Sequence, residues 1–170
     1  MDPRLVGTWR IEAVASRTGD YDDPNPTWTT LPPDPEKDAR LGAVAHTFRA
    51  DGTWQIGSPD VSSPPQQFTW RVEDEAGQLY LTLDMPWGPV SMRIWLRSDG
   101  RLIWEQNVFS RRTDGRREWF SPTERKWVGR DWLSQFSGWV AFVLVRDRPC
   151  AVETGQVGAE PDAPPDRGGM

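Results

Sequence analysis

Few side chains in this sequence have the type and spacing that chemistry needs, and the most suggestive are polar groups set among apolar ones. The chain has 170 residues and contains one histidine, His46. His46 alternates with Val44 and Phe48. Gln106 continues an alternation that begins at Leu102. Alternate residues of a strand share a face, so each polar group is expected on an otherwise apolar face. Either both are core side chains hydrogen-bonded to backbone or water, or they anchor the polar end of an apolar ligand.

Recognisable catalytic and cofactor motifs are absent from the sequence. It has no Gly-x-Ser-x-Gly elbow, no phosphate-binding Walker loop, no Gly-x-Gly-x-x-Gly and no His-Glu-x-x-His. With one histidine and one cysteine, Cys150, we expect no zinc or iron site of His and Cys ligands and no internal disulfide. We therefore expect neither a metal nor another cofactor.

Cofactor-free catalysis is the chemistry that the remaining polar groups would support. An apolar pocket can hold a substrate in a near-attack shape, while one or two hydrogen-bond donors polarise its carbonyl group. The residues that we expect in the catalytic role are His46, Gln106 and Tyr80, with Tyr21 as a further donor.

Eleven tryptophans are the most unusual feature of the composition. Trp9, Trp54, Trp70 and Trp104 fall on apolar strand faces, where tryptophan is usually a core residue. Four more, at positions 28, 87, 127 and 132, lie in or beside loops and a short helix, where they would form an aromatic rim near a barrel mouth. The side chains expected to contact a ligand are Phe48, Trp54, Trp70, Met92, Ile94, Trp104 and Trp28.

The elements that would position these side chains are short strands. Alternating runs start roughly every ten residues, as in an antiparallel meander, and several of them are separated by the turn signals Asp51-Gly52, Ala76-Gly77, Asp99-Gly100 and Asp114-Gly115. We therefore predict an all-β antiparallel up-and-down barrel of eight or nine strands. The predicted strands are 5–15, 43–50, 53–58, 67–74, 78–84, 89–97, 101–111, 116–121 and 138–146.

Alternation along the runs also divides each predicted strand into an apolar face and a solvent face. If the register of 101–111 is shifted by one, Glu105 and Asn107 replace Gln106 on the apolar face. The predicted inward set is Trp9, Ile11, Val44, His46, Phe48, Trp54, Ile56, Phe68, Trp70, Leu79, Leu81, Leu83, Met92, Ile94, Leu102, Trp104 and Gln106.

Three segments depart from the strand pattern. Residues 16–42 contain five prolines and are predicted to be a long loop without its own secondary structure, either a solvated surface loop or a lid over a site. Residues 129–138 place apolar groups at helical spacing and predict a short helix before the last strand. We expect one domain over 1–150 and a disordered tail, rich in Pro, Gly and acidic residues, over 151–170.

Two motifs resemble a known superfamily. The opening Leu5-Val6-Gly7-Thr8-Trp9-Arg10-Ile11 resembles the Gly-x-Trp first strand of the lipocalin and fatty-acid-binding (calycin) superfamily. The segment from Ala45 to Trp54, AHTFRADGTW, is similar to the second hairpin of small bacterial lipocalin-like domains. The resemblance implies that Trp9 closes one end of a barrel, with Arg146 or Arg148 packed across it. It also implies a ligand cavity, because eight-stranded barrels of this kind can hold one small molecule.

The charge balance limits the partners that we expect. A net charge of −5 argues against binding to a nucleic-acid backbone. No apolar run approaches the roughly 18 residues of a membrane span, and the first residues lack the apolar core of a signal peptide. We expect a cytoplasmic monomer or homodimer whose partner is a hydrophobic small molecule.

Three functions remain open on the sequence. The first is binding of a hydrophobic, conjugated or polycyclic molecule in an aromatic-lined cavity. The second is a cofactor-independent cyclase or isomerase, since some lipocalin-like barrels in natural-product pathways catalyse Diels–Alder-type [4+2] cyclisations. The third is a barrel with a filled interior that acts only through its surface.

Overall fold

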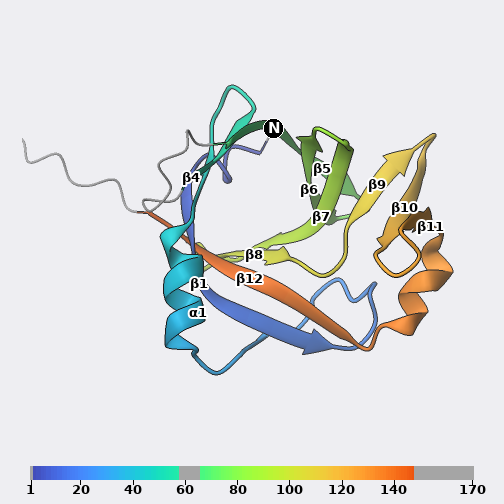
Figure 1. The fold of residues 1–170 in the computed structure, drawn as a ribbon, viewed down its shortest axis with the longest axis horizontal. Helices are drawn as coiled ribbons and strands as arrows, with labels where there is room; N and C mark the ends of the chain where they lie inside the picture. Colours follow the sequence, from blue (N-terminus) through green and yellow to red (C-terminus); the bar gives the residue numbers. More distant parts are fainter. Residues whose placement is uncertain (1, 58–65, 148–170) are drawn as a thin grey trace, which may run out of the picture.

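The computed structural model describes residues 2–57 and 66–147, which form an all-β fold with two short helices (Figure 1). The predicted tail, 151–170, lies outside the described residues. The strands are β1 (Gly7–Thr18), β2 (Thr29–Thr30), β3 (Ala45–Phe48), β4 (Thr53–Gly57), β5 (Gln66–Glu75), β6 (Gln78–Met85), β7 (Gly88–Leu96), β8 (Leu102–Glu105), β9 (Ser110–Thr113), β10 (Arg116–Ser121), β11 (Lys126–Val128) and β12 (Gly138–Arg146). The helices are α1 (Pro35–Ala43) and the 3-10 helix η1 (Arg130–Gln135).

Eight strands close into an antiparallel barrel in the order β1, β3, β4, β5, β6, β7, β8 and β12. The last strand, β12, pairs with β1, where Phe142 lies opposite Val14. On its other side β12 pairs with β8, which also pairs with β7, so Trp104 lies opposite both Phe142 and Ile94. Closure leaves these strands without a free edge. The predicted all-β up-and-down barrel is therefore confirmed, and its architecture is compatible with a lipocalin-like fold.

The predicted hairpin turns are confirmed by their backbone angles. The glycines of the four turn signals, Gly52, Gly77, Gly100 and Gly115, have φ between 77° and 88°. Such angles are disfavoured for residues with a Cβ atom, which explains why glycine occupies these positions.

One predicted strand, 101–111, proves to be two. Its first part is β8, which closes the barrel, and its second part is β9, which leaves the barrel and pairs with β10. A single bridge, between Ser91 and Ser110, connects β9 to β7. Strands β9, β10 and β11 thus form a small sheet beside the barrel, called the extension sheet below (Figure 1).

The segment 16–42 differs from the predicted unstructured loop. It contains the end of β1, the two residues of β2 and most of α1. The Asp34 side chain accepts a hydrogen bond from the Lys37 amide, and Pro35 occupies the first turn of α1. These are helix-start signals, because the carboxylate satisfies a free amide and proline lacks one.

The predicted helix before the last strand is confirmed as η1, which buries Trp132 and Leu133. Its geometry is that of a 3-10 helix, which suits a six-residue connection. Neither helix in the described part of the chain is long and apolar enough to cross a membrane.

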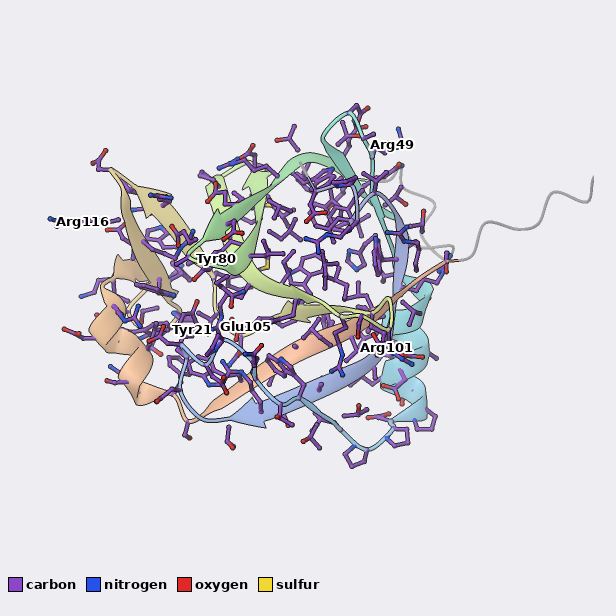
Figure 2. The ribbon with its side chains drawn as sticks, turned by 180° about the vertical axis from the view of Figure 1, so that it is seen from behind. Tyr21, Arg49, Tyr80, Arg101, Glu105 and Arg116 are labelled. Carbon is purple, nitrogen blue, oxygen red and sulfur yellow. The ribbon has the colours of Figure 1, made fainter. Side chains whose placement is uncertain are left out.

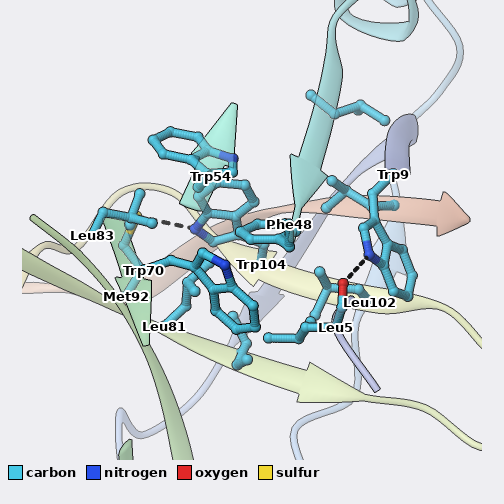
Figure 3. Close-up of a cluster of buried hydrophobic side chains, with 13 residues drawn as sticks. Leu5, Trp9, Phe48, Trp54, Trp70, Leu81, Leu83, Met92, Leu102 and Trp104 are labelled. Carbon is cyan, nitrogen blue, oxygen red and sulfur yellow. Dashed lines mark hydrogen bonds between the residues drawn. The ribbon is translucent and has the colours of Figure 1, made fainter. Parts of the chain in front are cut away.

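The main hydrophobic core fills one part of the barrel interior (Figure 3). Most of the predicted inward residues belong to it or pack against it, whereas Val44 is half-buried and does not. Its buried members are Leu5, Trp9, Ile11, Phe48, Trp54, Trp70, Leu81, Leu83, Met92, Ile94, Leu102, Trp104 and Leu144.

A second hydrophobic core lies outside the barrel. The prediction that one face of each strand is exposed to solvent is therefore wrong for the strands that this core covers. The extension sheet, η1 and residues 19–28 cover the outer faces of β6, β7, β8 and β12. Tyr21, Trp119 and Trp139 are buried there. Outward-facing residues of the covered strands are consequently buried as well: Tyr80, Thr82, Ser91, Arg93, Ile103 and Glu105.

Candidate functional site

An apolar cavity of about 740 Å³ lies between the barrel interior and the extension sheet. This size is within the range of pockets that bury a drug-sized molecule. Strands β3, β4, β6, β7, β8 and β12 contribute to it from the barrel. The lining residues are His46, Trp54, Leu83, Met85, Trp87, Val90, Met92, Trp104, Gln106, Phe109, Phe120, Pro122, Trp127 and Phe142.

His46 is the most unusual of these residues. It is 8% exposed, and neither ring nitrogen has a hydrogen-bond partner among the described residues. Burial lowers the pKa of His46 to about 4, because the charged imidazolium would lose its hydration. At neutral pH the ring is therefore uncharged, with one nitrogen that can donate and one that can accept a hydrogen bond.

Two indoles flank His46 and differ in their hydrogen bonding. Trp54 stacks on the imidazole with ring centroids 6.0 Å apart and planes within 6°, and its Nε1–H is buried without a partner in the part of the chain that is described. Trp104 meets the imidazole edge-on at 5.2 Å. Its Nε1–H instead donates to the sulfur of Met92 at 3.0 Å (Figure 3). Of the two indoles beside His46, one thus has a hydrogen-bonded N–H and the other does not.

Gln106 is the second polar side chain of the lining. Its amide nitrogen is 3.4 Å from the carbonyl oxygen of Trp104. Gln106 follows β8 in the register that directs Leu102 and Trp104 inward, whereas Glu105 is buried on the outer face. The unshifted register considered for this strand is therefore the observed one.

Of the side chains predicted to contact a ligand, only some meet at the cavity. His46 and Gln106 line it together with Trp54, Met92 and Trp104. The other predicted barrel residues, Phe48, Trp70 and Ile94, are buried in the core and do not line the cavity.

Tyr80 and Trp28 lie away from the cavity, on the outer side of the barrel. The guanidinium of Arg117 covers the Tyr80 ring at 3.6 Å from its centroid, and burial raises the pKa of Tyr80. Trp28 packs against Trp95, with ring centroids 5.5 Å apart. Tyr21, the further donor, is also in the outer core. These positions do not bring Tyr80 or Trp28 into contact with a molecule in the cavity.

The segment 16–42 contributes no residue to the cavity lining. Trp87 and Trp127, which the sequence indicated as rim residues, do contribute, and Trp87 is 74% exposed. Sequence reasoning did not identify Phe109, Phe120 and Phe142 as lining residues. No period-two signal could identify the first two, because they depend on how the extension sheet folds against the barrel.

A buried ion pair between Arg93 and Glu105 fixes the outer layer near Tyr21; Glu105 and Tyr21 are labelled in Figure 2. Two guanidinium nitrogens of Arg93 donate to the carboxylate of Glu105, at 2.9 Å and 2.6 Å. The third donates to the backbone carbonyl of Tyr21, and the guanidinium lies 3.4 Å from the centroid of the Tyr21 ring. The pair is matched and enclosed, which indicates a structural role in attaching residues 19–22 to the barrel.

In chemical terms, the cavity can exclude water from an apolar molecule and offer it a few neutral hydrogen-bonding groups. None of the described lining residues is charged. Within residues 2–57 and 66–147 no group of three or more His, Cys, Asp and Glu side chains is placed to hold a metal ion.

Comparisons with known proteins add no family to this description. No protein-family model matches the chain, and no curated protein or solved structure is significantly similar to it.

Proposed function

We propose that the protein binds a hydrophobic, conjugated or polycyclic small molecule in the cavity beside His46. The observation that carries the proposal is the lining itself: seven of its fourteen side chains are tryptophan or phenylalanine. Flat aromatic side chains contribute large contact areas and favour stacked or edge-on contacts with other rings. A planar ligand would make such contacts with several of them at once.

The size of the cavity weighs against the alternative of a filled barrel. Side chains of the inward barrel face, among them Met92 and Trp104, border an open cavity of about 740 Å³ and are not covered there by other core side chains. Its lining also differs from the packed part of the barrel, where Leu81 and Leu102 are fully buried. A binding function therefore accounts for the distribution of side chains better than a surface role does.

Tryptophan fluorescence and native mass spectrometry test the proposal. Pyrene, an uncharged polycyclic probe, should bind with one-to-one stoichiometry and accept excitation energy from the tryptophans. Trp127→Ala, which removes a lining side chain, should weaken binding, whereas Trp28→Phe, which alters an indole outside the cavity, should not. Native mass spectra of protein purified gently from its producing cells would reveal a retained ligand. Absence of saturable binding of any apolar probe would refute the proposal.

A second candidate function, a cofactor-independent cyclase or isomerase, draws support from the state of His46. A neutral imidazole with free nitrogens inside an apolar cavity can donate a hydrogen bond to a substrate carbonyl or accept a proton. Gln106 would be the second polar group, while Tyr80 is too far outside to take part. Turnover of a conjugated substrate that falls sharply in His46→Ala and Gln106→Ala would establish this function.

The cytoplasmic location and the monomeric or dimeric state remain predictions from the sequence. Cell fractionation and size-exclusion chromatography with light scattering test them.

A further inference from the structure

We infer that the ligand is an uncharged molecule with a hydroxyl or carbonyl group that hydrogen-bonds to His46 and to the indole N–H of Trp54. This inference rests on the proposed binding function and defines the chemical class of ligand that the same cavity takes. Two independent observations support it: the absence of charge from the lining, and the unpartnered polar atoms of two adjacent rings.

The lining offers nothing to balance a charged ligand. Moving an ionised group from water into an apolar site is strongly unfavourable unless an opposite charge accompanies it. The buried arginines of the described residues are on the outer side of the barrel and do not line the cavity, and Arg17 among them bonds to the backbone carbonyls of Asp20 and Tyr21. Arg93 pairs with Glu105, and Arg117 pairs with Glu75 at 2.8 Å. The cavity is therefore unsuited to an ionised fatty acid or an organic cation, despite its apolar character.

The unpartnered polar atoms define what the ligand must supply instead. Most buried polar groups in proteins have a hydrogen-bond partner, and leaving one without a partner is destabilising. Here the two nitrogens of His46 and the Nε1 of Trp54 lack one within the described residues, and their rings are stacked 6.0 Å apart. A hydroxyl or carbonyl oxygen can accept a hydrogen bond from the indole N–H or from the protonated nitrogen of the imidazole, and a hydroxyl can also donate to the other imidazole nitrogen.

Trp104 and Trp54, the two buried tryptophans of the lining, differ in the hydrogen bonding of their indole N–H groups. Both indoles line the cavity and both are nearly inaccessible to solvent. The N–H of Trp104 is bonded to Met92, so only that of Trp54 is available. The two tryptophans therefore form a matched pair for testing the role of the free N–H.

A series of four probes with one ring system tests the inference: pyrene, 1-pyrenemethanol, 1-pyrenecarboxylate and 1-pyrenemethylammonium. Dissociation constants are measured at pH 7 by energy transfer from tryptophan. We expect 1-pyrenemethanol to bind about threefold to tenfold more tightly than pyrene, the gain of one or two net hydrogen bonds. The two charged probes should bind more than about tenfold more weakly than 1-pyrenemethanol.

Variants then locate the polar contact. Trp54→Phe and His46→Phe should each reduce the preference for 1-pyrenemethanol over pyrene while pyrene binding persists. Trp104→Phe should weaken the binding of pyrene and of 1-pyrenemethanol by the same factor, because it removes apolar contact but no free hydrogen-bond donor. Circular dichroism checks that each variant is folded.

The outcomes separate the inference from the proposed function. Equal binding of pyrene and 1-pyrenemethanol to the wild-type protein overturns the inference and leaves a binding function intact. Carboxylate binding as tight as that of the alcohol overturns it as well. A preference for the alcohol that survives in both the Trp54 and the His46 variants places the contact elsewhere and also overturns it. If no member of the series binds, the proposed function fails too.

Discussion

The guanidinium of Arg146, near the end of the last barrel strand, lies 4.9 Å from the ring centroid of Trp9 in the first strand. The same side chain passes Gly7, where a Cβ atom would lie 3.5 Å from its Nε. Gly7 has φ of +139°, an angle that a residue with a Cβ rarely adopts. The φ angle is thus the physical reason for glycine at position 7 of the Gly-x-Trp opening, and contact with Arg146 is the reason for tryptophan at position 9. Of the two arginines that the resemblance indicated, Arg146 takes this position, while Arg148 lies outside the described residues.

The contact predicts that Arg146 stabilises the barrel without affecting its ligand. Arg146→Leu removes a cation–π contact and a hydrogen bond to the backbone carbonyl of Arg4. We expect the free energy of unfolding to fall by about 1–2 kcal/mol. Urea titration measures the change, and Arg116→Leu at an exposed hairpin position is the control. Weaker pyrene binding by folded Arg146→Leu would contradict this separation of roles.

Replacement of His46 by phenylalanine is expected to increase the stability of the protein and to reduce its preference for a ligand with a hydroxyl group. Phenylalanine has a similar shape but no nitrogen atoms that need partners. His46→Phe should therefore raise the free energy of unfolding of the ligand-free protein at pH 7 by about 1 kcal/mol. The same variant should lose the preference for 1-pyrenemethanol. Chemical denaturation and probe titration on one preparation check both effects, and a destabilised variant would show that the native imidazole has a structural partner.

The titration of His46 predicts a loss of stability in mild acid. Burial lowers its pKa to about 4 from an ordinary value of 6.5, so the unfolded chain takes up the proton first. This penalty on the free energy of unfolding is absent above about pH 6.5 and grows as the pH falls from there towards 4. Its full size is about 3 kcal/mol. Because carboxylates also titrate in this range, the measured quantity is the difference in unfolding free energy between wild type and His46→Phe at each pH. A difference that does not vary between pH 7 and pH 4 would exclude a buried, neutral His46.

The Arg93–Glu105 pair makes a prediction about the outer layer. Glu105→Gln leaves the buried guanidinium of Arg93 without its counter-charge and should lower the free energy of unfolding by about 3–5 kcal/mol. Replacing both residues, as in Arg93→Met with Glu105→Leu, removes both charges and should recover much of that loss. Because Arg93 also bonds to Tyr21, hydrogen exchange at residues 19–23 should be faster in the double variant. Unchanged exchange there would show that other contacts hold this segment.

The inward-facing residues of the barrel could be predicted from the sequence, because the alternation of side chains along a strand is a local rule. Alternation places Leu79, Leu81 and Leu83 on one face, and the observed pairing of β6 with β5 and β7 keeps them there. The same rule placed His46 and Gln106 inward. Asp-Gly and Ala-Gly turns then fixed the order of neighbouring strands.

The outer layer, which consists of the extension sheet, η1 and residues 19–28, could not be predicted from the sequence. Its position depends on which surfaces meet after the barrel forms. Tyr80 was predicted to have a catalytic role, yet Arg117 from the extension sheet covers its ring on the outer side of the barrel. Nothing in the alternation of 101–111 marks the point at which the chain leaves the barrel. The start of α1 at Asp34 and Pro35 is different, since a helix-capping signal was present there and the number of prolines obscured it.

The last prediction concerns the release of the ligand, for which the segment 16–42 was a candidate lid. No residue of this segment lines the cavity, whereas Trp87, at the β6–β7 turn, does so while 74% exposed. An exposed side chain that also borders the cavity is positioned at its mouth, so its contact with a leaving molecule is among the last to break. Trp87→Ala should therefore increase the dissociation rate of 1-pyrenemethanol about threefold to tenfold, the value of one aromatic contact. Trp28→Ala, within 16–42, should leave the rate unchanged if the protein stays folded. Stopped-flow displacement of the bound probe measures both rates. If only Trp28→Ala increases the dissociation rate, the segment 16–42, and not Trp87, controls the release of the ligand.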